Sequence, residues 1–368
     1  MINPILFKKT LNNNGFEFFT GVPDSVLKHF TNTLEEDENI IAVSEGSALT
    51  ISIGYYISKN KIPVVYLQNS GLGNIVNPYL SISSPKAYDF PVLFIIGWRG
   101  NPEIKDEPQH IHQGLISKDL LELMGIKTFE INGENFESII EKAKSSILEG
   151  ENAAILVNIG QFENYETKNI SKKKSIESLD AISYLKKKYP KNLFVASTGM
   201  IGRELYTITE ELNLESKNNF LNPGGMGHTM PLAASISKFS NKNIICIDGD
   251  GSLLMHMGNL HSTINVIAPK GFNYILINNN SHDSVGGQTT KAFNLNFELI
   301  ALGIGFEKYL KIESIKELDD FVLEKETNQF IEIIVSNRSN KNLLRPSESF
   351  AELKNIFKQN FEEKTDNS

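Results

Sequence analysis

Residues 244–252 read IICIDGDGS and residues 274–280 read YILINNN, and these two stretches decide the fold. Each begins with a short, continuous apolar run and ends in a polar cluster. Uninterrupted apolar runs of this length are typical of parallel strands that are covered by helices on both faces. The polar clusters at 248–252 and 278–280 therefore follow directly on strands, which is where ligands bind in an open α/β sheet.

The same pattern continues along the whole chain. Short apolar runs alternate with segments of helical periodicity, and this alternation predicts an α/β fold with two doubly wound parallel-sheet domains. The predicted helices are residues 47–58, 115–124, 136–148 and 230–237. The predicted strands are residues 40–43, 64–67, 92–96, 154–157, 193–196, 244–247, 274–277 and 330–335.

The alternation is interrupted once, by the polar and charged residues 162–178, FENYETKNISKKKSIES. A stretch of this composition is typical of a linker between domains. A chain of 368 residues also suits two domains of ordinary size. We expect a first domain over residues 1–165, a linker over 166–178, and a second domain over 179–368 that ends in a frayed tail.

The composition excludes several classes of protein. The formal net charge of −8 leaves no basic excess for a general nucleic-acid binder. The longest apolar run, residues 90–98, is too short to span a bilayer, and the first residues, MINP, show no secretory signal pattern. The single cysteine, Cys246, lies in an apolar run and is expected to be a buried thiol. We therefore expect a cytoplasmic protein that binds neither nucleic acid nor membrane.

The polar clusters at the two strand ends have the chemistry of a magnesium site. Mg²⁺ prefers oxygen ligands, usually one or two carboxylates together with phosphate oxygens and water. Asp250 offers a carboxylate, Asn279 an amide oxygen, and Ser281 a backbone carbonyl oxygen. Gly249 and Gly251 would let the backbone approach a diphosphate closely, and the start of the following helix favours an anion.

The interval between GDG and NN resembles the signature of thiamine-diphosphate enzymes, in which these motifs hold Mg²⁺ and the diphosphate. In residues 222–228, NPGGMGH, the resemblance implies that Met226 supports the bent cofactor and that the carbonyl of Gly224 accepts from its 4′-amino group. In residues 44–48, SEGSA, it makes Glu45 the acid that bonds N1′ of the aminopyrimidine ring and promotes deprotonation of C2. The implied cofactor-binding residues are Glu45, Gly224, Met226, Gly249, Asp250, Gly251, Ser252 and Asn279, and the implied metal ligands are Asp250, Asn279 and Ser281.

Taken singly, each motif also fits a purely structural interpretation: a strand-end turn, a glycine turn before a helix, or an acid at a helix N-terminus. Longer strings are more specific, and they resemble two-domain 2-oxo acid decarboxylases of the phosphonopyruvate and sulfopyruvate type. The linker leaves no room for the middle domain of larger decarboxylases. The matching strings are TGVPDS (20–25), QNSGLGN (68–74), GWRG (97–100), KDEPQH (105–110), SHDSVGGQ (281–288) and LRP (344–346).

This resemblance implies the conversion of 3-phosphonopyruvate to phosphonoacetaldehyde and CO₂, in phosphonate (2-aminoethylphosphonate) biosynthesis. It also implies at least a homodimer, because in this family the glutamate and the metal ligands meet across a subunit boundary. A phosphonate group needs cations or amide donors. The implied catalytic residues are Glu45, Asp24 and His110, and the candidates for binding the small anionic substrate are Asn69, Arg99, Lys105, His282 and Arg345.

Two departures from the family pattern leave the substrate open. Gly225 stands where a serine is common, and Asn280–Ser281 stand where Gly-Ala is usual. The alternatives are a sulfopyruvate decarboxylase, another decarboxylase or carboligase of a small anionic 2-oxo acid, and a non-catalytic nucleotide-binding scaffold. The joint presence of Glu45, Asp250 and Asn279 argues against the scaffold.

Overall fold

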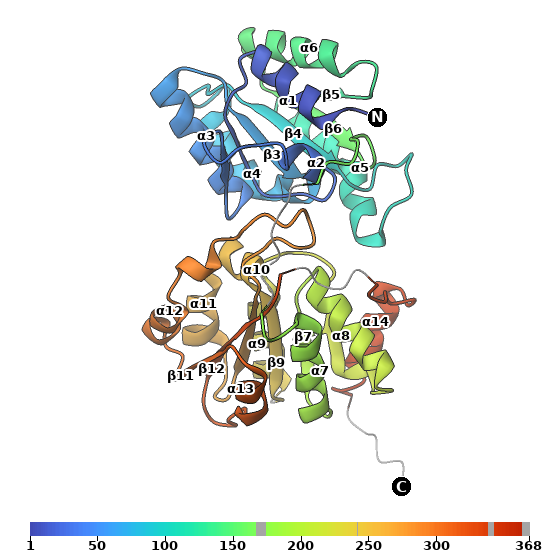
Figure 1. Ribbon diagram of the computed structural model, residues 1–368, viewed down its shortest axis with the longest axis vertical. Helices are drawn as coiled ribbons and strands as arrows, with labels where there is room; N and C mark the ends of the chain where they lie inside the picture. Colours follow the sequence, from blue (N-terminus) through green and yellow to red (C-terminus); the bar gives the residue numbers. More distant parts are fainter. Residues whose placement is uncertain (167–173, 241, 338–341, 363–368) are drawn as a thin grey trace. The chain divides into compact units, whose positions relative to one another are not determined.

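The computed structural model describes residues 1–166, 174–240, 242–337 and 342–362. The chain divides into two compact units, Met1–Asn169 and Ile170–Ser368 (Figure 1). This division falls within the segment 166–178 that the sequence predicts as a linker, of which residues 167–173 lie outside the described part. Ile176, from the end of that segment, is fully buried in the core of the second unit.

The first unit is built on six parallel strands in the order β2-β1-β3-β4-β6-β5. The strands are β1 (Phe19–Gly21), β2 (Asn39–Ile41), β3 (Val64–Gln68), β4 (Leu93–Trp98), β5 (Lys127–Glu130) and β6 (Ala153–Asn158). The helices are α1 (Pro4–Asn13), α2 (Lys28–Thr31), α3 (Glu45–Lys59), α4 (Leu72–Pro78), α5 (Pro108–Leu123) and α6 (Phe136–Leu148).

Successive residues of the central strands enter opposite cores, as expected for a sheet covered on both faces. In β3, Val64 and Tyr66 pack with α1, α2 and α6, whereas Val65 and Leu67 pack with α3, α4 and α5. Burial on both faces explains why these strands read as continuous apolar runs.

The second unit repeats this architecture with six parallel strands in the order β11-β12-β10-β9-β7-β8. Helices α7, α8 and α13 cover one face, and α9 to α12 with α14 cover the other. The strands are β7 (Leu193–Ala196), β8 (Asn219–Leu221), β9 (Ile244–Gly249), β10 (Asn273–Asn278), β11 (Lys308–Ile312) and β12 (Gln329–Ile334). The helices are α7 (Ser178–Lys188), α8 (Met200–Glu211), α9 (Thr229–Ser240), α10 (Asp250–Met255), α11 (Asn259–Ser262), α12 (Phe297–Ile304), α13 (Ile315–Asp320) and α14 (Phe350–Lys358).

The sequence predicted eight of these strands and missed β1, β5, β8 and β11. Strands β1 and β8 have three residues each, and no apolar run of four residues marks them, as residues 40–43 mark the equally short β2. Strands β5 and β11 lie at sheet edges and are partly exposed, so they lack a continuous apolar run.

Cys246 is a buried free thiol in the core of the second unit, as predicted. Within the described residues, helices are too short or too polar to cross a membrane.

Lys186 in α7 is fully buried. Its Nζ donates to Oδ1 of Asn219 at 3.0 Å and lies 4.4 Å from the ring centroid of Phe194. Burial lowers the pKa of Lys186 to about 8, from 10.5 for an unperturbed lysine. The folded chain therefore disfavours the charged form, and this penalty is fully present below pH 8 and vanishes above pH 10.5.

We expect Lys186→Met to stabilise the folded chain more at pH 7 than at pH 10. Its free energy of unfolding, relative to that of the parent, should be higher at pH 7 by about 2 kcal/mol. The reason is that methionine has no charge to desolvate. Urea unfolding at the two pH values measures this difference, and Lys187→Met, on the exposed neighbour in the same helix, is the control. A Lys186→Met effect that stays constant with pH would contradict the argument.

Candidate active site

The predicted metal ligands of the second unit follow two neighbouring strands. Strand β9 ends at Gly249 and α10 begins at Asp250. Strand β10 pairs with β9 in parallel, with Ile277 opposite Gly249, and it ends directly before Asn279. The carboxyl ends of adjacent parallel strands therefore present Asp250 and Asn279 at the same edge of the sheet.

Asp250 is a buried carboxyl group, only 3% exposed. Burial raises its pKa to about 7, even though its Oδ2 accepts a hydrogen bond from the hydroxyl of Thr290, and the nearby charge of Asp283 adds to the rise. An ionised carboxylate in this position is destabilised unless a cation compensates it. The environment of Asp250 thus suits a bound cation.

Asp283 organises the other two predicted ligands. One of its carboxylate oxygens accepts from Nδ2 of Asn279 at 2.9 Å and the other from Oγ of Ser281 at 2.8 Å. Because Nδ2 is held by Asp283, the oxygen of the Asn279 amide must point elsewhere, and it accepts from the Ser281 amide at 2.9 Å. Asn280, between them, has a φ of +56°, a conformation that asparagine tolerates better than most residues.

The predicted metal ligands at this edge are all oxygen atoms. Among the described residues, there is no group of three or more His, Cys, Asp or Glu side chains that could bind a metal. The predicted ligands are one carboxylate, that of Asp250, and two neutral oxygens, those of the Asn279 amide and the Ser281 carbonyl. Mg²⁺ accepts such a set when phosphate oxygens complete its coordination.

The glycine loop 224–228 lies against the start of α10. The amide of Gly227 donates to Oγ of Ser252 at 2.9 Å, and the side chain of Asn259 donates to the Gly227 carbonyl at 2.8 Å. A β-carbon at Gly251 would lie 3.2 Å from Cε of Met226 and 3.0 Å from Cε1 of His282. The structure therefore brings together three of the predicted stretches, around 226, 251 and 282.

Conformation explains Gly225, one of the two departures from the family pattern. Gly225 has a φ of +61°, where a serine would be strained. Desolvation lowers the pKa of His282 to about 4, so that its imidazole is neutral at pH 7. Its ring therefore offers a neutral donor or acceptor instead of a positive charge.

In the first unit, the predicted acid Glu45 is the first residue of α3, four residues after β2 ends at Ile41. Its side chain is 5% exposed, and burial raises its pKa. Asn74 opposes this rise, since its Nδ2 donates to Oε2 of Glu45 at 2.6 Å. A β-carbon at Gly71 would lie 2.3 Å from Oε1, so glycine at this position makes room for the carboxyl group.

Asp24, predicted as catalytic, is fully buried. Its Oδ2 accepts from the amides of Val26 and Leu27, and its Oδ1 accepts from Nε2 of Gln68 at 2.6 Å. Burial raises the pKa of Asp24, and these hydrogen bonds oppose the rise. The geometry of Asp24 is that of a group that fixes the loop after β1 and orients Gln68.

Asn69 and Arg99, predicted to bind substrate, are engaged with protein groups. Asn69 is 3% exposed and bonds the backbone of Arg99 through both ends of its amide, at 2.8 and 3.0 Å. The Arg99 guanidinium forms a two-pronged ion pair with Asp106, at 2.8 and 2.6 Å, and donates to Ser25 at 3.1 Å. Burial alone would raise the pKa of Asp106, but the bonds from Arg99 and the Gly100 amide outweigh it and lower that pKa.

The remaining predicted residues differ in exposure. Lys105 is exposed in the loop before α5, and Arg345 is exposed in the segment before α14. His110, in the first turn of α5, is half-buried, and its Nδ1 is buried without a hydrogen-bond partner among the described residues. Desolvation, followed by the charge of Arg99, lowers the pKa of His110. A β-carbon at Gly100 would lie 2.0 Å from the His110 carbonyl oxygen, so this glycine seats the start of the helix.

Sequence reasoning missed several residues that contact predicted ones, among them Asn74, Asp283 and Thr290. Asn74 and Asp283 lie within the matching strings QNSGLGN and SHDSVGGQ, so their place beside a predicted site residue was a usable signal. Thr290 lies forty residues from Asp250, and their contact follows only from the fold.

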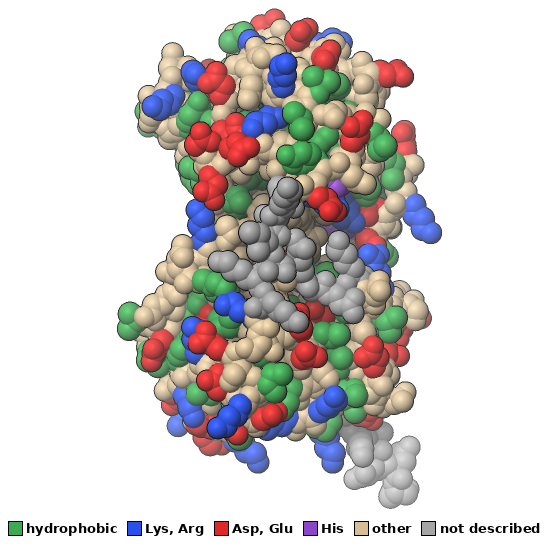
Figure 2. Space-filling view, in the orientation of Figure 1, with side chains coloured by type: hydrophobic (Ala, Val, Ile, Leu, Met, Phe, Trp, Pro, Cys, Tyr) green, Lys and Arg blue, Asp and Glu red, His purple; other side chains and the backbone are tan. Residues whose placement is uncertain are grey.

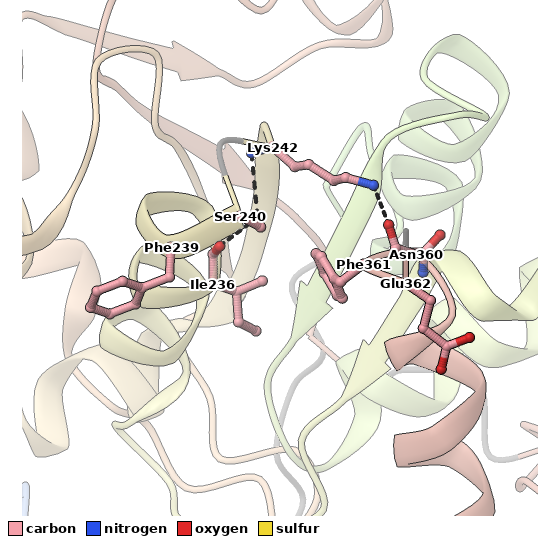
Figure 3. Close-up of a pocket in the computed structure, with 7 residues that line it drawn as sticks. All are labelled: Ile236, Phe239, Ser240, Lys242, Asn360, Phe361 and Glu362. Carbon is pink, nitrogen blue, oxygen red and sulfur yellow. Dashed lines mark hydrogen bonds between the residues drawn. The ribbon is translucent and has the colours of Figure 1, made fainter. Parts of the chain in front are cut away.

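A hollow of about 590 Å³ lies elsewhere in the second unit. Ile236 and Phe239 lie on one side and Phe361 on the other (Figure 3). Helix α9 ends here, just before β9 begins, and Asn360 bonds the Lys217 carbonyl just before β8 begins. The hollow is thus at the amino ends of the strands, opposite the edge that carries the predicted residues. The visible surface of each unit mixes acidic and basic side chains (Figure 2).

Comparison with known proteins agrees with this arrangement. Residues 6–123 match the family described as thiamine pyrophosphate enzyme, N-terminal TPP binding domain. Residues 197–332 match the thiamine pyrophosphate enzyme, C-terminal TPP binding domain. Thiamine pyrophosphate is another name for thiamine diphosphate, and the two matches fall one in each structural unit.

Three relatives narrow the comparison. A phosphonopyruvate decarboxylase of Streptomyces viridochromogenes is 27% identical over 84% of this chain and 82% of its own length. A sulfopyruvate decarboxylase of Methanosarcina acetivorans is 25% identical over 83% of each chain. The alpha subunit of a sulfopyruvate decarboxylase of Methanococcus maripaludis is 36% identical over 33% of this chain and 72% of the subunit. The chain therefore belongs to the thiamine pyrophosphate enzyme family, within the group of phosphonopyruvate and sulfopyruvate decarboxylases.

Proposed function

We propose that the chain is a magnesium-dependent phosphonopyruvate decarboxylase that forms phosphonoacetaldehyde and CO₂ in phosphonate biosynthesis. The observation that carries this proposal is the match to phosphonopyruvate decarboxylases, which extends over 84% of the chain and includes both units. The buried acids at the carboxyl ends of the strands support it, because they supply the groups that such a reaction needs.

The second unit would hold the metal and the diphosphate. Asp250, Asn279 and the Ser281 carbonyl would bind Mg²⁺, and the oxygen donors already gathered at this edge support that role. Gly249, Gly251 and Ser252 would line the diphosphate at the start of α10. Met226 would support the middle of the cofactor, with the Gly224 carbonyl accepting from its amino group; the contact between Met226 and Gly251 supports this placement.

Bound thiamine diphosphate supplies a nucleophilic carbon at C2 and an electron sink for the electrons left by CO₂. Glu45 would hold a proton shared with N1′ of the aminopyrimidine ring. The burial of Glu45 supports this role, because a raised pKa makes the protonated form of its carboxyl group easier to reach. Burial would also keep water away from the shared proton.

We further propose a homodimer or higher oligomer in which Glu45 of one chain and Asp250 of another act on the same cofactor. Two observations support this proposal. The two residues belong to different units of the chain, and the resemblance of the chain to two-domain decarboxylases implies a site between subunits. Sulfopyruvate decarboxylases also have subunits named alpha and beta, and the two such subunits compared match 33% and 35% of this chain.

The residues around the substrate anion would divide into two sets. Lys105 is exposed, and His110 has a buried nitrogen with no hydrogen-bond partner in the described part of the chain, so these two would contact the substrate, together with His282 and Arg345. Arg99, Asn69 and Asp24 would act indirectly, because Asp106, Ser117 and Gln68 engage their polar atoms. Fixed in this way, Arg99 would still add positive charge near the anion.

Sulfopyruvate is the second candidate substrate, since sulfopyruvate decarboxylases also align with the chain. A phosphonate can carry one more negative charge than a sulfonate. The ratio of kcat/KM for the two substrates therefore reports how well the positive charge of the site matches each anion.

The first test compares release of CO₂ from 3-phosphonopyruvate, sulfopyruvate and pyruvate by the holoenzyme. We expect kcat/KM to be highest for 3-phosphonopyruvate and at least about 100-fold lower for pyruvate, which lacks the anionic group that the site would pair. A kcat/KM that is higher for sulfopyruvate than for 3-phosphonopyruvate would show that the proposed substrate is wrong and would favour sulfopyruvate. Release that requires an added acceptor carbonyl would indicate a carboligase.

The second test is Glu45→Gln. We expect kcat to fall by about 100- to 10,000-fold, because an amide cannot exchange a proton with N1′. Calorimetry should show that thiamine diphosphate still binds in the presence of Mg²⁺, and Glu141→Gln, at an exposed position in α6, serves as the control. Unchanged turnover in Glu45→Gln would remove the basis of the proposed mechanism.

A further inference from the structure

We propose that Asn74 is a positioning residue for Glu45: its amide holds one carboxyl oxygen and thereby directs the proton of this acid to the other. This inference rests on the proposed function, because it gives Glu45 the role of the proton-sharing acid. It adds a second residue to that role and assigns the two oxygens of Glu45 different tasks.

The packing around Glu45 leaves its carboxyl group little freedom. Glu45 begins α3, and Asn74 lies in the first turn of α4. Oε1 lies against Gly71, where a β-carbon would come within 2.3 Å, and Oε2 accepts from Asn74 at 2.6 Å. The two helices also approach closely at Gly46, where a β-carbon would lie 3.0 Å from the Asn74 carbonyl oxygen.

The spacing of Gly71 and Asn74 gives both residues access to the same carboxyl group. Residues three apart lie on the same side of a helical turn. The one-turn segment Asn69–Gly71 leads directly into α4, so Gly71 and Asn74 face Glu45 together. The glycine provides the space and the asparagine provides the hydrogen bond.

The chemistry of the amide decides where the proton of Glu45 resides. An N–H group can only donate, so Oε2 must act as an acceptor whether Glu45 is ionised or protonated. In the protonated acid, the proton therefore sits on Oε1. Asn74 thus ensures that Oε1 is the oxygen that exchanges the proton throughout the catalytic cycle.

Asn74 also limits the effect of burial. Burial raises the pKa of Glu45, and the bond from Asn74 is the larger of the two hydrogen bonds that oppose it, the other being to the backbone of Glu45 itself. Among the described residues, neighbouring charged groups are not among the causes of the raised pKa of Glu45. The balance therefore depends on one neutral side chain.

The test measures exchange of the C2 proton of bound thiamine diphosphate for deuterium, without substrate, by NMR after acid quench. We expect Asn74→Leu to slow this exchange by about 10- to 100-fold, the range for one lost hydrogen bond to a charged group. Cofactor affinity, measured by calorimetry, should be nearly unchanged. Asn77→Leu makes the same substitution at an exposed position of the same helix and should exchange at the parental rate.

A double-mutant cycle with Glu45→Gln separates positioning from general damage. If Asn74 acts through Glu45, adding Asn74→Leu to Glu45→Gln should slow exchange by less than about twofold. If the double variant instead exchanges more slowly than Glu45→Gln by the full factor that Asn74→Leu causes alone, the inference is wrong. Asn74→Ala, which removes the amide without adding bulk, is the second variant should the leucine variant fold poorly, and it should also slow exchange.

The outcomes distinguish the inference from the proposed function. If Glu45→Gln slows exchange and Asn74→Leu exchanges like the parent, the role of Asn74 is wrong while that of Glu45 stands. If Glu45→Gln itself exchanges at the parental rate, the proposed function fails at its first step.

Discussion

Each unit buries a carboxyl group at the carboxyl ends of its parallel strands, and the predicted residues of that unit lie around it. Glu45 follows β2 in the first unit, and Asp250 follows β9 in the second. Both have raised pKa values because burial disfavours the charged carboxylate. A fold that keeps acids in such positions must compensate them with hydrogen bonds or with a cation.

The compensation differs between the two acids, and the difference matches their proposed tasks. Glu45 receives a neutral hydrogen bond from Asn74, which leaves it free to gain or lose a proton. Asp250 accepts a hydrogen bond from the hydroxyl of Thr290. The nearby carboxylate of Asp283 adds negative charge, which raises the pKa of Asp250 further. The first environment suits proton exchange, and the second suits a divalent cation. Asp283, in holding Asn279 and Ser281, would act on the metal through its ligands.

Much of this arrangement could be predicted from the sequence. The central strands were found because burial on both faces makes them continuous apolar runs, and Asp250 and Asn279 were found because they follow such strands. Glu45 follows the partly exposed edge strand β2, and it was found by its resemblance to the family's activating acid. Partners such as Asn74 and Thr290 were missed because a local pattern does not show which distant side chain will face a buried acid. Arg99 was predicted as a candidate for binding the substrate anion, and its ion pair with Asp106 was missed for the same reason, because it depends on how the intervening loop folds.

The central claim is that Glu45 and Asp250 from different chains serve one cofactor, and a hybrid dimer tests it most directly. Glu45→Gln and Asp250→Ala chains, co-expressed with different tags and purified as the mixed dimer, place both defects in one site and leave the other intact. The account predicts that each variant alone is nearly inactive and that the hybrid recovers about half of the parental activity per dimer. A hybrid no more active than the single variants would contradict it.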